Sequence, residues 1–433
     1  MFFLNNKKGF TVFFITILVL IAAFGVIVNM TFVSYLQSKI LRNAVSSSRA
    51  YYAAEAGLED ALLRFLKMGM PCSDPNTLLV GDALANVSVE NISTSLTVLS
   101  QGHSFGMERT LEIKARVVSG EVSFCYGVQV GEGGLTMKGN AEILGNIYSN
   151  GSITGDSNTK IYGDVYSAGE TGLIDSMKIF KSGSGEDDGN AYANTISGSN
   201  IENGAYYQNI IGTTAGAYYP LSPDPEYENM PISEEQITAW KNDAEQGGVI
   251  TGYYLGGSDE DSLGPIKVEG DFEMDSNAVL TQTGTIWVTG DIILGSNSVI
   301  ELDSSYGLDS GTIIADGRIL LNSNVVICGS EGYKKAGKCY NNQGSFLMLL
   351  STNNSLDPYS PAISSTSNSN AAIFYASQGM IRLDSNSYLK EVTGYVLYLD
   401  SNASVVYESG LANVNFVTGP GGSWEIQSWK EIE

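Results

Sequence analysis

The residues of this sequence that could carry out chemistry are few and dispersed. His103 is the single histidine among 433 residues, which nearly excludes a Ser-His-Asp triad or a histidine-rich zinc site. No C-x-x-C pair occurs among the four cysteines, so spacing does not support zinc. An even number of cysteines favours disulfides in an oxidising compartment. We predict one bond between Cys328 and Cys339 and a second between Cys72 and Cys125.

Acidic clusters and paired aromatic residues are the remaining candidate ligand sites. E-D-D at Glu186 and D-E-D at Asp259 offer oxygen ligands, but the D-x-[DN]-x-[DN]-G loop of a calcium site is absent, so solvated loop acids are favoured. We expect no metal and no cofactor. Aromatic faces can stack on sugar rings, although packing inside the protein is the commoner role. The glycan contacts predicted on this basis are Tyr206, Tyr207, Tyr218, Tyr219 and Trp240.

Enzymatic activity is not expected. Glycan-degrading enzymes need clustered carboxylates or a basic residue near a groove. Four aspartates could align on neighbouring repeats, but no arginine repeats with them; they are Asp275, Asp303, Asp384 and Asp400. A tethered glycan-degrading enzyme therefore stays the least favoured alternative.

Composition excludes a nucleic-acid binder. Lys plus Arg total 23 against 47 Asp plus Glu, a net charge of −24, so phosphates would not be neutralised. Only 16% of residues are charged, against about 25% in an ordinary soluble domain. Glycine, with 49 residues, and Asn, Ser and Thr take the place of charge, which suits a structural or secreted β protein.

The N-terminal segment predicts a membrane-spanning helix. Residues 10–33 are almost all apolar, long enough to cross a hydrocarbon core of about 30 Å. Lys7 and Lys8 precede this stretch, so a single pass would leave a short N-terminus in the cytoplasm and the rest outside. A signal anchor or a cleavable secretory peptide is the alternative, but the stretch is long for a typical signal peptide and no small-x-small site closes it.

The helix is predicted to continue beyond the membrane over residues 34–68 and to end at Gly69 and Pro71. Apolar residues recur there at spacings of three and four and form one face. They are Tyr51, Ala54, Leu58, Leu62 and Phe65. The first half of the helix is thus apolar all round and the second half amphipathic.

This N-terminal region resembles a type IV pilin precursor. The residues that carry the likeness are the short basic leader ending in K-K-G-F-T, the apolar helix that follows, and S-S-S-R-A-Y-Y-A-A-E-A-G-L-E-D-A-L over 46–62. The last stretch is similar to PilX-type minor pilins and to the large tip pseudopilin of type II secretion. The resemblance covers about the first 70 residues. It implies that a prepilin peptidase removes residues 1–9 by cutting between Gly9 and Phe10, and that Phe10 is then N-methylated.

One position departs from the family pattern. Major pilins carry Glu at the fifth mature position, where this sequence has Phe14. In the family that Glu neutralises the N-terminal amine of a neighbouring subunit. A buried amine without an acceptor costs free energy, so Phe14 marks a subunit outside the repeating shaft, such as a tip subunit.

The rest of the chain predicts β structure in two parts. Short alternating runs over 71–128 predict a small antiparallel sheet packed on the helix. Residues 129–433 repeat a small-residue–Asn corner between β-branched runs, which favours a parallel β-helix over a β-sandwich with Asn-rich turns. The repeated residues are Asn140, Asn158, Asn277, Asn297, Asn324, Asn386 and Asn402. Asn tolerates the left-handed conformation of a tight corner, and stacked Asn side chains can form a hydrogen-bonded ladder.

An insertion is predicted over about 170–265, where the repeat is interrupted. Within it, residues 233–246 predict a helix with a capping box at Ser233 and Gln236, docked on the side or end of the repeats.

The sequence therefore predicts an α+β protein with residues 10–70 as a transmembrane and stalk helix. The favoured function is a minor, tip-located subunit of a pilin-like filament that displays its β-helix for adhesion at a prokaryotic cell surface. Its predicted partners are other pilin-like subunits, prepilin peptidase, the membrane and surface glycans. A membrane-anchored surface scaffold that never joins a filament is the alternative.

Overall fold

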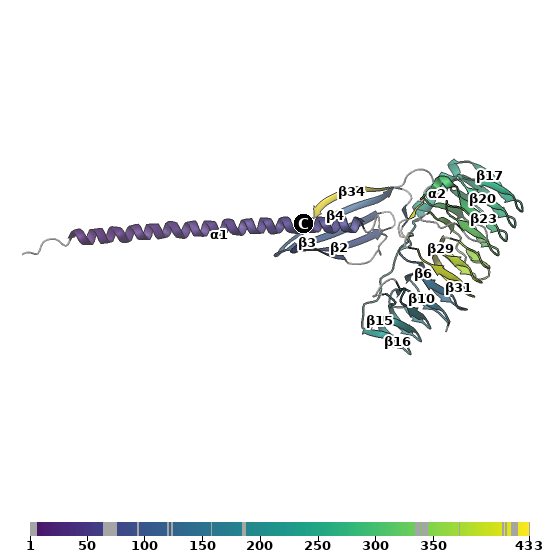
Figure 1. Ribbon diagram of the computed structural model, residues 1–433, viewed down its shortest axis with the longest axis horizontal. Coiled ribbons are helices and arrows are strands. Elements are labelled where there is room, and N and C mark those ends of the chain that lie inside the picture. Colours follow the sequence, from purple (N-terminus) through teal and green to yellow (C-terminus); the bar gives the residue numbers. More distant parts are fainter. Residues whose placement is uncertain are drawn as a thin grey trace, which may run out of the picture.

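The chain consists of a long helix, a small antiparallel sheet and a large parallel-stranded domain (Figure 1). The structure is a computed structural model. It describes residues 7–432 except 64–75, 93–94, 119–120, 123, 157, 184–187, 334–338, 340–344, 372, 409–410, 412–413 and 417–422. The predicted long helix and small antiparallel sheet are confirmed, and the third part is mostly parallel sheet, as predicted.

Helix α1 (Lys7–Leu63) has 57 residues and is roughly 85 Å long. The side chains of residues 12–45 are exposed, and by length and composition Val12–Ala61 could cross a membrane. From Ser46 onward one face is buried against the small sheet, and Ala54 and Leu58 are fully covered. The predicted apolar face therefore exists where the structure describes it; the Leu62 side chain and Phe65 lie outside the described residues.

The small sheet has the strand order β1-β2-β3-β4-β34, and all its neighbours are antiparallel. Its strands are β1 (Asn76–Val80), β2 (Ala83–Ile92), β3 (Ser95–Ser104), β4 (Met107–Val118) and β34 (Ser423–Ile432). Helix α1 lies directly on the backbone of β3 at Gly102, where a Cβ atom would come within 1.9 Å of the Ala50 carbonyl oxygen. Glycine here permits the close approach.

The last strand corrects the predicted domain boundaries. Residues 129–433 were expected to form one domain, but β34 pairs with β4 and completes the small sheet. The register shifts between Ile426 and Ser428, so the strand lacks the strict alternation that would have identified it. Two short strands, β5 (Glu121–Val122) and β33 (Val414–Asn415), pair antiparallel where the chain passes between the two domains. The parallel domain is thus inserted into the small sheet.

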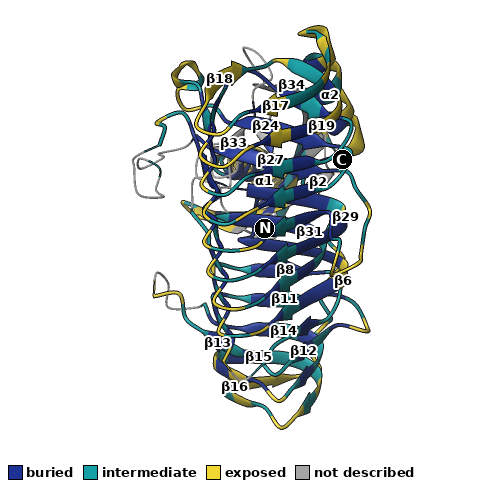
Figure 2. Cartoon of the chain, turned by 90° about the vertical axis from the view of Figure 1, so that its right-hand side faces the viewer, coloured by how far each residue is buried: buried dark blue, intermediate teal, exposed yellow. Residues whose placement is uncertain are grey.

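The parallel domain, called the head below, consists of short strands stacked side by side, as Figure 2 shows. Its first half contains β6 (Val128–Met137), β7 (Glu142–Leu144), β8 (Ile147–Ser149), β9 (Ile153–Thr154), β10 (Lys160–Tyr162), β11 (Val165–Ser167), β12 (Leu173–Asp175), β13 (Lys178–Phe180), β14 (Ala191–Ser197), β15 (Asn200–Ile211) and β16 (Thr214–Pro220).

Its second half contains β17 (Val249–Leu255), β18 (Glu260–Leu263), β19 (Ile266–Met274), β20 (Val279–Gln282), β21 (Ile286–Val288), β22 (Ile292–Leu294), β23 (Val299–Leu302), β24 (Gly311–Ala315), β25 (Ile319–Leu321), β26 (Val326–Cys328), β27 (Leu347–Ser351), β28 (Ile363–Ser365), β29 (Ile373–Leu383), β30 (Tyr388–Leu389), β31 (Glu391–Leu399) and β32 (Ser404–Val406). All strand pairings within the head, among the residues described, are parallel except at β5 and β33.

The chain enters the stack in its middle. The first half builds outward from β6 to β16, and residues 221–248 then carry the chain to the opposite end of the stack. The second half builds back from β17 until β31 pairs with β6 and β32 pairs with β7 (Figure 1). The two halves are therefore joined by parallel pairing between strands far apart in sequence.

The predicted insertion is much shorter than 170–265. Strands β12 to β16 and β17 to β18 lie within the stacked sheets, and the segment that leaves them is 221–248. The S-N corner is missing there because the turns of the stack are closer in sequence, with Ala191 opposite Ala205 and Ala205 opposite Tyr218. The left-handed corner residues there are Ser176, Gly198 and Gly212, with φ of 55–59°.

Helix α2 (Glu234–Gln246) lies on the side of the stack. Ser233 caps it, and its hydroxyl accepts the Gln236 amide at 3.3 Å. Ile237, Trp240 and Ala244 are buried, as the apolar face predicts. Together with parts of residues 122–124 and 411–416, this helix covers an apolar outer face of the second half around Ile314, Met348 and Tyr375.

Asparagine corners hold successive turns of the stack together. Six of the seven predicted residues have positive φ: Asn140, Asn277, Asn297, Asn324, Asn386 and Asn402. Asn368 was not among the predicted residues, because no apolar run follows it directly, but it also has positive φ, at 50°. Their side-chain amides form the predicted ladder in two runs, 277–297–324 and 368–386–402–140, with N···O distances of 3.0–3.3 Å. The bond from Asn140 to Asn402 links the two halves.

Candidate functional site

The N-terminal processing residues lie at the start of α1. Gly9 and Phe10 are within its first helical residues, and Phe14 is 61% exposed. From Val12 to Val33 the helix presents exposed apolar side chains on almost every face. A surface of this size and composition is stable in a lipid bilayer or against other apolar helices, so this half of α1 is a candidate anchoring and assembly site.

Polar contacts fix the other half of α1 to the edge of the small sheet formed by β4 and β34. The Arg109 guanidinium on β4 donates to Ser47 Oγ at 2.9 Å and to Glu431 Oε1 on β34 at 2.7 Å. Lys430 on β34 pairs with Glu112 on β4 at 3.0 Å. The final strand is therefore bound to the helix as well as to its neighbour, and the head is held at one end of α1 (Figure 1).

The predicted glycan-contact tyrosines belong to a stacked series in the first half of the head. The rings of successive strands are stacked in the order Tyr148, Tyr166, Tyr192, Tyr206 and Tyr219, with centroids 4.3–5.4 Å apart, and Tyr126 packs at a tilt against Tyr148. Tyr206 lies between two other rings, and Tyr219 ends the series on β16, 45% exposed. Of the remaining two, Tyr207 packs against the core and Tyr218 is 50% exposed.

The crossing segment 221–232 covers part of this series. The Tyr148 hydroxyl donates to the Glu226 carbonyl, and Asn150 exchanges two hydrogen bonds with Glu228 at 2.7 and 2.9 Å. Burial raises the pKa of the Tyr148 phenol above its usual range and also raises the pKa of Glu228. Packing, the alternative role considered for these tyrosines, accounts for most of the series.

Trp240 is not a glycan contact. The side chain is 2% exposed and its ring lies 5.9 Å from that of Phe416. The amphipathic face of α2 points it into the apolar layer between helix and sheet. A buried tryptophan fixes α2 in place and cannot stack on a sugar.

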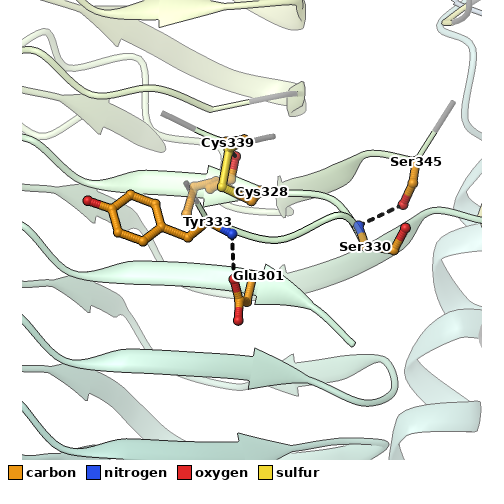
Figure 3. The surroundings of a disulfide bond; sticks show 7 residues. Glu301, Cys328, Ser330, Tyr333, Cys339 and Ser345 are labelled. Atoms are coloured by element: carbon orange, nitrogen blue, oxygen red, sulfur yellow. Dashed lines mark hydrogen bonds between the residues drawn. A yellow bond between two sulfur atoms is a disulfide. The ribbon is translucent and has the colours of Figure 1, made fainter. Parts of the chain in front are cut away.

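Cys328 and Cys339 form a disulfide at the edge of the second half (Figure 3). The Tyr333 amide between them donates to Glu301 Oε2 at 2.7 Å, which ties the loop to the preceding turn of the stack. Cys125 is also disulfide-bonded. Its predicted partner, Cys72, lies outside the described residues.

The aspartates of the repeat have separate partners. Asp384 pairs with Arg382 at 2.9 Å, and Asp275 accepts a hydrogen bond from the Tyr254 hydroxyl at 2.7 Å. Asp303 instead caps a 3-10 turn through the Ser305 amide. These contacts are ones that stabilise loops and corners.

An open polar groove of about 590 Å³ lies where the two halves of the head meet and was not predicted. It is lined by Asn140, Glu142, Asn158, Lys160, Lys178, Asn402 and Ser404. A three-residue motif in the sequence marks this groove: a charged residue, then Ile, then a large apolar residue. It occurs as E-I-L on β7, K-I-Y on β10 and K-I-F on β13. In each, the central Ile is buried and the flanking residues face outward.

Comparison with known proteins identifies no family. No family model and no curated protein matches the sequence. Among solved structures, the competence-associated pilin ComZ from Thermus thermophilus aligns with 89% of this chain and 97% of its own, at 11% identity and a TM-score of 0.23. Similarity at that level carries no argument for a shared fold or function.

Proposed function

We propose that this chain is a minor subunit of a pilin-like filament, anchored by α1 and carrying the head outside the cell. The observation that supports this best is the division of α1. A basic K-K-G-F-T leader opens a helix that is exposed over residues 12–45, is almost all apolar over 12–33, and is then packed on a small antiparallel sheet. This combination is the one implied by the resemblance to type IV pilin precursors.

The shape of the head supports a terminal position in the filament. The long direction of the stack lies across the axis of α1 (Figures 1 and 2). Subunits repeated along a shaft pack α1 beside α1, and a head extending sideways would collide with its neighbours. A subunit at the tip has no such constraint, and Phe14 in place of the shaft glutamate supports the same position.

The head is proposed to be a β-helix that serves as a display surface without enzymatic activity. Parallel pairing between successive short strands, an apolar interior and the Asn corners support this architecture. A β-helix is stiff and presents its outward side chains in rows, which suits adhesion at the cell surface.

Gold labelling of sheared filaments tests the tip assignment. An epitope tag is placed after Leu356, in an exposed loop of the head, and a matched tag goes on the major shaft subunit. We expect gold at one end of each filament for the head tag and along its length for the shaft tag. Head label confined to the cell membrane would instead support the anchored scaffold, and label along the shaft would contradict the tip position.

A further inference from the structure

The polar groove on the head is built by parallel register across the junction of its two halves. Ser404, Glu142, Lys160 and Lys178 lie opposite one another on β32, β7, β10 and β13. Parallel strands are spaced about 4.8 Å apart, so the groove presents one polar side chain per strand along the axis of the stack. A linear polymer lying along the axis would meet similar groups at regular intervals.

Side-chain amide groups lack protein hydrogen-bond partners, among the residues described, where the Asn ladder ends. Asn140 donates to Asn402 Oδ1 at 3.2 Å, and the ladder does not continue to Asn158 on the next turn. The backbone amide of Asn158 donates to the Asp156 side chain at 2.9 Å. Within the described chain, no hydrogen bond reaches Asn140 Oδ1 or the Asn158 side-chain amide. Both residues are exposed in the groove.

The groove also holds a cation without a partner. Lys160 pairs with Glu142 at 2.6 Å, whereas Lys178 forms no ion pair with any described residue. Several other basic side chains of the head pair with acids, as with Lys241 and Asp316 at 2.5 Å, and Lys138 lies over the Tyr398 ring. In a chain with a net charge of −24, an unmatched lysine among amides is positioned for a carboxylate.

An apolar strip runs beside the polar row. Leu144, Tyr162 and Phe180 lie opposite one another two residues further along the same strands. Leu144 is 39% exposed, and the rings of Tyr162 and Phe180 are 5.5 Å apart. Aromatic and aliphatic surface next to amides and charges is the combination that binds sugar rings by their faces and their hydroxyls by hydrogen bonds.

We propose that this groove binds an acidic polysaccharide, one whose sugars carry carboxylates, laid along the axis of the head. Lys178 pairs with a carboxylate, Asn140 and Asn158 bond the hydroxyls, and Tyr162 and Phe180 contact the ring faces. The inference rests on the proposed function for the display of the head outside the cell, and it replaces the tyrosine pairs near β16 as the glycan site.

Titration of the full chain in detergent micelles with polygalacturonate oligosaccharides tests the site. We expect Lys178→Met to weaken binding tenfold or more, since it removes a charge-assisted hydrogen bond to the ligand. Asn158→Ala should weaken it several-fold, and Lys178→Arg should retain most of the affinity. Lys430→Met makes the same charge change on the small sheet, where the side chain is 54% exposed, and should leave binding unchanged.

Two further ligands give the outcomes that overturn the proposal. Methyl-esterified polygalacturonate keeps the sugars and removes the charge, and dextran sulfate keeps charge without carboxylates; both should bind at least tenfold more weakly. Equal binding of either, no binding of polygalacturonate, or unchanged affinity in Lys178→Met would each refute the site. Filament incorporation of Lys178→Met is measured in parallel and should be normal, so failure of the glycan site is distinguished from failure of the filament assignment.

Discussion

Glu391 is a buried carboxylic acid in the head. It is fully buried at the start of β31; Thr393 donates to its Oε1 at 2.6 Å, and Oε2 has no hydrogen-bond partner among the residues that the structure describes. Burial raises its pKa well above the usual carboxyl range. The Glu391 carboxyl therefore binds its proton more tightly in the folded state than in the unfolded state. Its contribution to stability is complete below the unfolded pKa of about 4.3 and is lost as pH rises through the folded pKa.

Replacing this acid should stabilise the head at neutral pH. Glu391→Gln keeps the shape and the acceptor for Thr393 but cannot ionise, so we expect a gain of roughly 1–3 kcal/mol at pH 7–8 that shrinks toward pH 4. Denaturant unfolding across this pH range measures it. Glu273→Gln, an exposed site on β19, is the control and should show no such trend. A gain that is independent of pH would rule out ionisation as its cause.

At the scale of elements, the Asn ladder contributes to stability in two separable ways. Asn386 has φ 64°, donates to Asn368 Oδ1 at 3.1 Å and accepts from Asn402 at 3.1 Å. Alanine removes both bonds and is strained at this φ by about 1–2 kcal/mol, whereas glycine removes the bonds without that strain. The conformation and the hydrogen bonds can therefore be measured independently.

We expect Asn386→Ala to lower the free energy of unfolding by about 2–3 kcal/mol and Asn386→Gly by roughly 1 kcal/mol less. Chemical denaturation of the two variants measures the difference. If Asn386→Gly lowered the free energy of unfolding as much as Asn386→Ala, the left-handed backbone conformation would not explain why asparagine recurs at these corners.

The packing of α1 on β3 gives a second prediction for an element. In Gly102→Ala the new Cβ would lie 1.9 Å from the Ala50 carbonyl oxygen and 2.7 Å from the Ala54 nitrogen, both backbone atoms that a rotamer change cannot move. We expect a loss of roughly 1–3 kcal/mol and faster hydrogen exchange in α1 over residues 46–61. Gly25→Ala, with no atom within 4 Å of its Cβ, should leave exchange there unaltered. Unchanged exchange in Gly102→Ala would mean that α1 is not held closely to β3.

At the scale of the whole molecule, local sequence signals predicted elements and missed their connections. The capped helix α2 and the Asn corners followed from spacing because each depends on a few neighbouring residues. The pairing of β31 with β6 and of β34 with β4 depends on contacts between distant segments, and no local pattern encodes it. Trp240 was misassigned for the same reason, since only the tertiary structure shows that its helix face is covered. The polar groove is formed by four strands in register, so each lysine alone looked like ordinary surface.

The molecule as a whole combines a membrane-type helix with a head inserted into a small sheet. The proposed function depends most on proteolytic processing at the start of that helix. Intact-mass and peptide mass spectrometry of the protein from its native membrane tests this most directly. We expect a mature chain that begins at Phe10 with a methylated α-amine. A chain that still begins at Met1, with Lys7 to Gly9 present and Phe10 unmethylated, would contradict it.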